Sequence, residues 1–243
     1  MRTIGSLLAS SLLIIATCSA DAAELTADRT DLFRVPLVCG AAPEIGCGSR
    51  AKPLLLQLET LRDVESAWLD RTGDHIAIVW KDARLTRKQR SKAIKESFTR
   101  NDVPIDLVAD ATEHARLFAD FNGGGRWYRA AEVDALSKEE AGVIAGNIVG
   151  QLLEGKHLDP ERSEDLRMEL RAYFELELVK LRSRDELFSS EVQENWRSGM
   201  RAIGEKYVGA GNMPEAQIRS SKVKGCETGT HKDCCKGKSS CKH

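Results

Sequence analysis

The residues best suited to chemistry in this sequence are cysteines, and they gather near the two ends of the chain. Cys39 and Cys47 lie eight residues apart, and the last eighteen residues hold a second group of soft ligands. That second group consists of Cys226, His231, Cys234, Cys235, Cys241 and His243. Thiolates and imidazoles are ligands that copper, zinc and mercury ions prefer. The sequence therefore predicts two metal sites, with the one in the tail the looser of the two.

The spacing of Cys39 and Cys47 leaves two other interpretations open. The pair would also suit a structural disulfide in an oxidising compartment, or a redox pair that alternates between dithiol and disulfide. Cys47 precedes a predicted helix and stands three residues before Arg50. Both the helix dipole and the guanidinium favour a thiolate, so we expect a lowered pKa for the Cys47 thiol.

Patterns typical of an enzyme are missing from the sequence. His75, His114 and His157 are isolated, and no serine lies in a G-x-S-x-G sequence. The three glycines at 123–125 lack the order of a nucleotide-binding loop. These observations favour a binding protein over an enzyme, with a non-catalytic interaction module as a further alternative.

The first residues have the features of a secretory signal. Arg2 precedes an apolar stretch at 4–16, and Ala20-Asp21-Ala22 fits a cleavage site between small residues. We expect a signal peptide over 1–22 and an exported, periplasmic protein, with lipid attachment at Cys18 as the alternative. Because the apolar stretch is too short to span a bilayer, we expect no transmembrane segment in the mature chain.

The composition excludes some functional classes. Of the 243 residues, 42% are hydrophobic and 30% are charged, which supports a folded core. The 36 basic residues nearly balance the 37 acidic ones. A nucleic-acid-binding protein needs a strongly basic face, so we expect no nucleic-acid partner.

Hydrophobic periodicity predicts an α+β domain over 31–110. Alternating apolar residues predict strands, and apolar residues at helical spacing predict helices. In chain order these are a strand at 32–39, a helix from about 54, strands at 64–70 and 75–80, a helix at 86–99 and a strand at 103–108. The order β-α-β-β-α-β is that of the ferredoxin-like fold.

The second half of the chain predicts a helical bundle over 111–213. After a short helical connector at 111–121 and a glycine-rich break come helices over about 137–154, 161–182 and 183–208. Ser137 and Glu140 have the spacing of a capping box at the start of the first of these helices. We expect the bundle to offer a surface to a partner protein, and the polar segment 214–243 to be a flexible Cys-rich tail.

The first domain resembles the heavy-metal-associated domain family, which includes copper chaperones and the periplasmic mercury-binding protein. Alignment of Arg50 with the second cysteine of the family's G-M-T-C-x-x-C loop places Cys47 at the first cysteine. Apolar residues then fall at the family's helix and strand positions, at Leu54, Leu58, Leu61 and Val64. The strand at 76–82 and the Ala93-Ile94 turn of the second helix also match.

The resemblance covers about 80 residues and implies a ferredoxin-like fold with a metal loop between the first strand and the first helix. The loop departs from the family's pattern because Arg50 replaces the second metal-binding cysteine and Cys39 stands eight residues before Cys47. The resemblance therefore supports the fold more directly than the metal site. The combined expectation is an exported protein that sequesters or transfers a soft metal ion.

Overall fold

The computed structural model describes residues 25–40 and 42–214. The predicted signal peptide and Cys18 lie outside the described residues. So do the predicted metal ligands of the tail, Cys226, His231, Cys234, Cys235, Cys241 and His243. The described residues contain the sheet, the helices and the Cys39–Cys47 pair.

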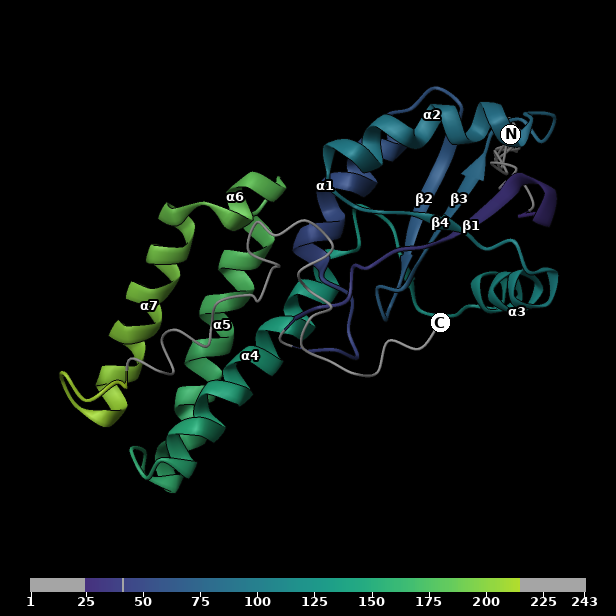
Figure 1. Cartoon of the computed structure of the whole chain (residues 1–243). Helices are drawn as coiled ribbons and strands as arrows, with labels where there is room; N and C mark the ends of the chain where they lie inside the picture. Colours follow the sequence, from purple (N-terminus) through teal and green to yellow (C-terminus); the bar gives the residue numbers. More distant parts are fainter. Residues whose placement is uncertain (1–24, 41, 215–243) are drawn as a thin grey trace, which may run out of the picture.

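The predicted α+β class is confirmed, because the described chain combines one antiparallel sheet with surrounding helices (Figure 1). The sheet has five strands in the order β4-β1-β3-β2-β5, and each neighbouring pair is antiparallel. The strands are β1 (Thr30–Arg34), β2 (Val64–Asp70), β3 (His75–Trp80), β4 (Asp106–Leu107) and β5 (Trp127–Tyr128).

Strand β3 shows why the sheet is covered on both faces. Successive side chains of a strand point to opposite faces. Ile76 and Ile78 belong to the core beneath helix α1 (Gly48–Glu59) and helix α2 (Arg87–Arg100). Ala77 on the opposite face packs instead with residues of helix α3 (Ala111–Asn122). The continuous apolar sequence of β3 therefore follows from its central place in the sheet.

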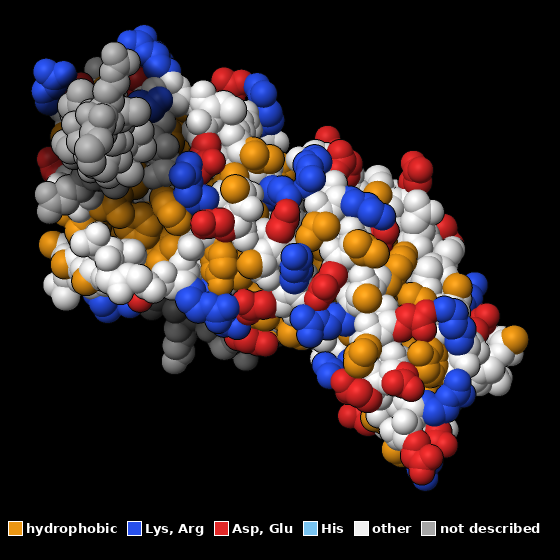
Figure 2. All heavy atoms as spheres, turned by 180° about the vertical axis from the view of Figure 1, so that it is seen from behind, with side chains coloured by type: hydrophobic (Ala, Val, Ile, Leu, Met, Phe, Trp, Pro, Cys, Tyr) orange, Lys and Arg blue, Asp and Glu red, His pale blue; other side chains and the backbone are white. Residues whose placement is uncertain are grey.

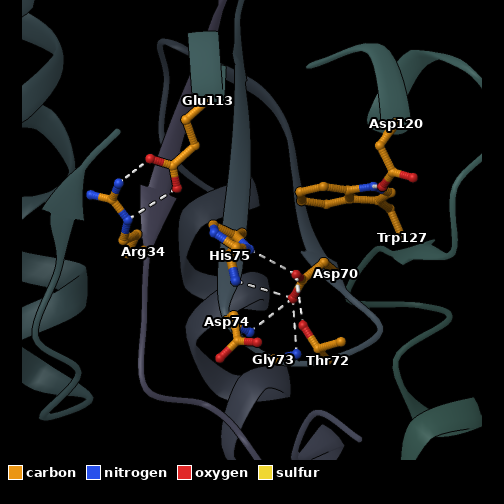
Figure 3. Close-up of polar contacts among 9 residues, drawn as sticks. All are labelled: Arg34, Asp70, Thr72, Gly73, Asp74, His75, Glu113, Asp120 and Trp127. Atoms are coloured by element: carbon orange, nitrogen blue, oxygen red, sulfur yellow. Dashed lines mark hydrogen bonds and ion pairs between the residues drawn. The ribbon is translucent and has the colours of Figure 1, made fainter. Parts of the chain in front are cut away.

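Helix α3 covers the second face of the sheet, and the short strand β5 extends the sheet at the edge beside β2. Arg34 of β1 donates to Glu113 of α3, with Nε and Oε1 3.2 Å apart (Figure 3). After the glycine-rich break, Trp127 of β5 donates through Nε1 to Asp120 Oδ2 over 2.9 Å (Figure 3). The predicted connector at 111–121 is thus a helix that packs on the sheet. The domain limits at 31–110 and 111–213 stay a prediction.

Three long helices stand beside the sheet layer (Figure 1). These are α4 (Asp134–Glu154), α5 (Ser163–Lys180) and α7 (Ser190–Val208), and a shared core includes Phe174, Trp196 and Met200. The predicted single helix over 183–208 is divided in the structure into the short α6 (Arg184–Phe188) and α7, with Ser189 between them. The Ser189 side chain accepts from the Val192 amide and so caps α7.

The predicted start of α4 at Ser137 is wrong. The helix begins at Asp134, so Ser137 and Glu140 are interior positions with fully buried side chains and form no capping box. The extension is explained by Leu136, which continues the apolar stripe of α4 into the core beneath the sheet. One half of α4 packs in that core, and the half from Ala141 onward packs against α5, which in turn contacts α7.

Charged side chains of both signs are mixed over the face seen from behind (Figure 2). This view shows no large patch of one sign, in agreement with the near balance of basic and acidic residues. Within the described ranges, no helix has both the length and the apolar character that a membrane crossing requires.

Candidate thiol site

The two cysteines near the start of the chain lie on a small hairpin between β1 and α1. Residues 37–39 run antiparallel to residues 45–47. The Cys39 amide donates to the Ile45 carbonyl oxygen over 2.8 Å, and the Cys47 amide donates to the Leu37 carbonyl oxygen over 2.6 Å. The predicted strand at 32–39 is therefore interrupted, since β1 ends at Arg34 and the chain then pairs with its own loop.

Cys39 and Cys47 take diagonal positions on this hairpin. Val38 lies opposite Gly46, and each cysteine is the next residue along its own segment. Because side chains alternate along extended chains, both thiols project from the same side. Diagonal neighbours are typically ~7–8 Å apart, whereas a disulfide needs Cα atoms within ~4.4–6.8 Å. Neither cysteine forms a disulfide with any residue that the structure describes.

The hairpin is supported by the turn between β2 and β3, which Asp70 organises (Figure 3). Asp70 Oδ1 accepts from the amides of Gly73, Asp74 and His75 at 2.8, 2.9 and 3.0 Å. Its other oxygen accepts from the Thr72 hydroxyl over 2.9 Å and lies 2.9 Å from His75 Nδ1. His75 therefore belongs to this turn, which accounts for one of the isolated histidines.

Arg71 connects this turn to the cysteine hairpin and to α4. Its carbonyl accepts from the Gly46 amide over 2.7 Å. Its guanidinium donates to the Glu44 carbonyl over 3.2 Å and to the Glu139 carboxylate over 2.8 Å. The hairpin is thus fixed on the side of the sheet and on the side of α4.

A buried acid lies beside the thiols. Glu140 of α4 is 0% exposed, and its Oε1 accepts from Cys39 Sγ at 3.1 Å. Its Oε2 is buried and has no hydrogen-bond partner among the described residues, and the same is true of the Ser137 hydroxyl one helical turn earlier. Burial raises the pKa of Glu140 to about 7, although the hydrogen bond from Cys39 acts in the opposite direction.

Sequence analysis missed Glu140 as a site residue because its spacing from Ser137 matched a capping box. A signal for burial was present in the sequence. Leu136, Glu140 and Ile144 recur at intervals of four residues, and both apolar neighbours are buried. A carboxylate on an otherwise apolar helix face is an uncommon feature that indicates a specific role.

The expected lowering of the Cys47 pKa is wrong. Burial raises the pKa of this thiol to about 12, and the nearby Glu140 charge acts in the same direction. The Ser49 hydroxyl, 3.5 Å from Sγ, and Arg50 favour the thiolate but do not outweigh burial. The Arg50 guanidinium instead donates to the Pro36 carbonyl over 3.4 Å in an exposed position.

The pair is therefore brought together in the structure but buried, with 2% of Cys39 and 1% of Cys47 exposed. Over residues 25–40 and 42–214, no three or more His, Cys, Asp or Glu side chains are grouped so that they could hold a metal ion as they stand. This hairpin therefore offers a metal ion two ligands, the sulfur atoms of Cys39 and Cys47.

Burial predicts slow chemical modification of the pair. We expect Cys39 and Cys47 to react with iodoacetamide at neutral pH at least ~100-fold more slowly in the folded protein than in denaturant, because only the thiolate is nucleophilic. The measurement uses full-length protein in which the other five cysteines, Cys18, Cys226, Cys234, Cys235 and Cys241, are serine. Equal rates in the two conditions would contradict the buried arrangement.

Comparisons with protein-family models, with curated proteins and with solved structures find no match to this chain.

Proposed function

We propose that this protein binds a soft metal ion between the thiolates of Cys39 and Cys47. The observation that supports the proposal most strongly is a pair of buried thiols on one side of a single hairpin, with the Glu140 carboxylate against one of them. A structural pair of core cysteines would have no need of a buried acid. In a metal site, such a carboxylate holds the Cys39 thiol through its hydrogen bond until the ion displaces the thiol proton to solvent.

The spacing of the pair favours an ion over a direct bond between the sulfurs. Diagonal hairpin positions are ~7–8 Å apart, which exceeds the usual span of a disulfide. A two-coordinate ion placed between Cys39 and Cys47 lengthens the connection by two metal–sulfur bonds of ~2.3 Å each. Cu(I) and Hg(II) accept two sulfur ligands, so two donors are sufficient for them.

We also propose that the sheet and its helices form a ferredoxin-like domain. The order β4-β1-β3-β2 with α1 and α2 on one face is the split β-α-β arrangement, with β5 added at the edge beside β2. In this arrangement the cysteine hairpin lies between the first strand and the first helix, the place of the metal loop in heavy-metal-associated domains. The helices α4, α5 and α7 then form a small bundle.

The remaining parts of the proposal concern segments outside the described residues. We propose that the protein is exported to the periplasm and that the tail supplies a second, looser metal site. In an oxidising compartment, the buried Cys39–Cys47 pair would be protected from oxidants by the same burial that slows alkylation.

The test is a metal titration of the full-length chain with the other five cysteines replaced by serine. Under reducing conditions, Cu(I) and Hg(II) are expected to produce thiolate-to-metal charge-transfer absorption that saturates at one ion per chain. Cys39→Ser and Cys47→Ser should each lower the affinity at least ~100-fold, because one of two donors is lost. Absence of the absorption band, or a band unchanged by both substitutions, would refute the proposal.

A second candidate is thiol–disulfide exchange, which the hydrogen bond from Cys39 to Glu140 favours because a carboxylate can accept the thiol proton. The oxidant would be a disulfide of a partner, which takes up two electrons as Cys39 and Cys47 form a disulfide and release two protons. A measured reduction potential well below about −300 mV, the range of structural disulfides, would count against this candidate.

A further inference from the structure

Two buried polar atoms on α4 beside the thiol pair have no hydrogen-bond partner among the described residues. They are Oε2 of Glu140 and Oγ of Ser137, which lie on the same helix face because they are three residues apart. A methyl group placed on Gly48, the residue after Cys47, would come within 2.5 Å of the Ser137 hydroxyl. The two orphaned atoms therefore border the thiol pair from the side of α4.

Such atoms are uncommon in protein interiors, since buried polar groups almost always form hydrogen bonds. Packing alone would be served better by an apolar residue at position 140. The position of Glu140, with one oxygen on a proposed ligand and the other unpartnered, indicates a role toward whatever binds between Cys39 and Cys47.

We infer that Glu140 determines the metal preference of the thiol pair and favours a divalent ion such as Hg(II), Zn(II) or Cd(II) over Cu(I). The inference rests on the proposed metal-binding function and adds a residue that discriminates between ions. Glu140 acts through its charge beside the site and through an oxygen that is available to a bound ion.

The charge of the buried complex explains the preference. Two thiolates with Cu(I) carry one net negative charge, and an ionised Glu140 at 3.1 Å from Cys39 Sγ adds a second. Two thiolates with a divalent ion are neutral, so the carboxylate is then the only net charge of the complex. Buried like charges repel strongly at low dielectric, and this repulsion penalises Cu(I). Lys52 of α1 offers no net countercharge, because it is paired with Asp134.

Donor chemistry acts in the same direction. Carboxylate oxygen is an ordinary ligand of Zn(II), whereas Cu(I) selects sulfur donors. Glu140 Oε2 would give up no protein hydrogen bond on turning toward an ion. In the described conformation Glu140 and the two cysteines are not grouped as a three-ligand site. Direct coordination therefore requires a side-chain rotation, whereas the charge effect does not.

The experiment compares Glu140→Gln with the parent protein in the full-length background whose other five cysteines are serine. Cadmium(II) chloride and Cu(I) are titrated separately against chelators of known affinity, and the ratio of the two affinities is measured. Glu140→Gln is expected to weaken Cd(II) binding at least ~10-fold and to leave Cu(I) binding unchanged or tighter. Glu154→Gln, at the exposed far end of α4, is the matched control and should leave both affinities unchanged.

The outcomes separate this inference from the function on which it rests. If the parent binds neither ion, the proposed function fails and the inference fails with it. If the parent binds both ions and Glu140→Gln leaves their affinity ratio unchanged, only the inference fails. An equal decrease in the affinities for both ions in Glu140→Gln would indicate a structural role for Glu140 and would also overturn the inference. Far-UV circular dichroism of the same samples shows whether the variant is folded.

Discussion

Replacing Glu140 by glutamine is expected to increase the free energy of unfolding at pH 8 relative to the wild-type protein. Burial raises the pKa of Glu140 from 4.5 to about 7, so the folded state holds the proton more tightly than the unfolded state. The resulting stabilisation of wild type is fully present below pH 4.5 and is lost as the pH rises to about 7. A shift of this size corresponds to about 3 kcal/mol.

The glutamine variant does not titrate at this position, so the difference in stability between the two proteins should grow by about 3 kcal/mol between pH 4 and pH 8. Urea unfolding at a series of pH values under reducing conditions measures this difference. The Cys47 thiol does not interfere, since its pKa of about 12 lies outside the window. Glu154→Gln should instead follow wild type at every pH, and parallel profiles for Glu140→Gln and wild type would contradict the buried charge.

Much of the fold could be predicted from local sequence patterns. The alternation of β-branched residues over 75–80 predicted β3, and the apolar stripe at Leu166, Leu170 and Phe174 predicted α5. These elements bury one or both faces along their whole length, so each residue contributes to the periodic signal. The succession of two helices and four strands over 31–110 was predicted for the same reason.

The edges of the sheet were predicted only in part. The strand expected at 103–108 is confirmed but shortens to the two residues of β4, and β5 has two residues, too few for a period to be recognised. β5 exists because Asp70 and Leu69 of β2 offer an unpaired edge to Trp127 and Tyr128, a contact between distant segments. Likewise, the extension of α4 to Asp134 depends on a core that only the folded chain forms.

The thiol site was predicted in part. The sequence predicted that Cys39 and Cys47 form one site, and in the structure both side chains lie on the same side of the hairpin. The sign of the Cys47 pKa shift was wrong because a helix N-terminus and Arg50 are visible in the sequence whereas burial by α4 is not. Glu140 comes from 93 residues beyond Cys47 along the chain, so its place beside the thiols depended on tertiary structure.

The turn at Gly73 should be among the most sensitive positions for both stability and metal binding. Gly73 has φ +79°, a backbone conformation that residues with a Cβ seldom adopt. A Cβ there would lie 2.5 Å from the Leu37 carbonyl oxygen and 2.7 Å from Gly46 Cα. Both are backbone atoms of the cysteine hairpin, so the hairpin itself would have to move. Gly73→Ala is expected to cost about 2–4 kcal/mol, from backbone strain and overpacking together.

Gly124→Ala provides a control that separates these two contributions. Gly124 has φ +86°, but a Cβ there would meet nothing within 4 Å. It should therefore cost only the backbone strain of about 1–2 kcal/mol and leave metal affinity unchanged. Gly73→Ala should lower the free energy of unfolding by more than Gly124→Ala does. It should also weaken the binding of Cu(I) and Hg(II), since it moves the segment that carries Cys39 and Cys47. Denaturant unfolding and metal titration of both variants test this, and equal effects would show that close packing of the turn against the hairpin does not position the thiols.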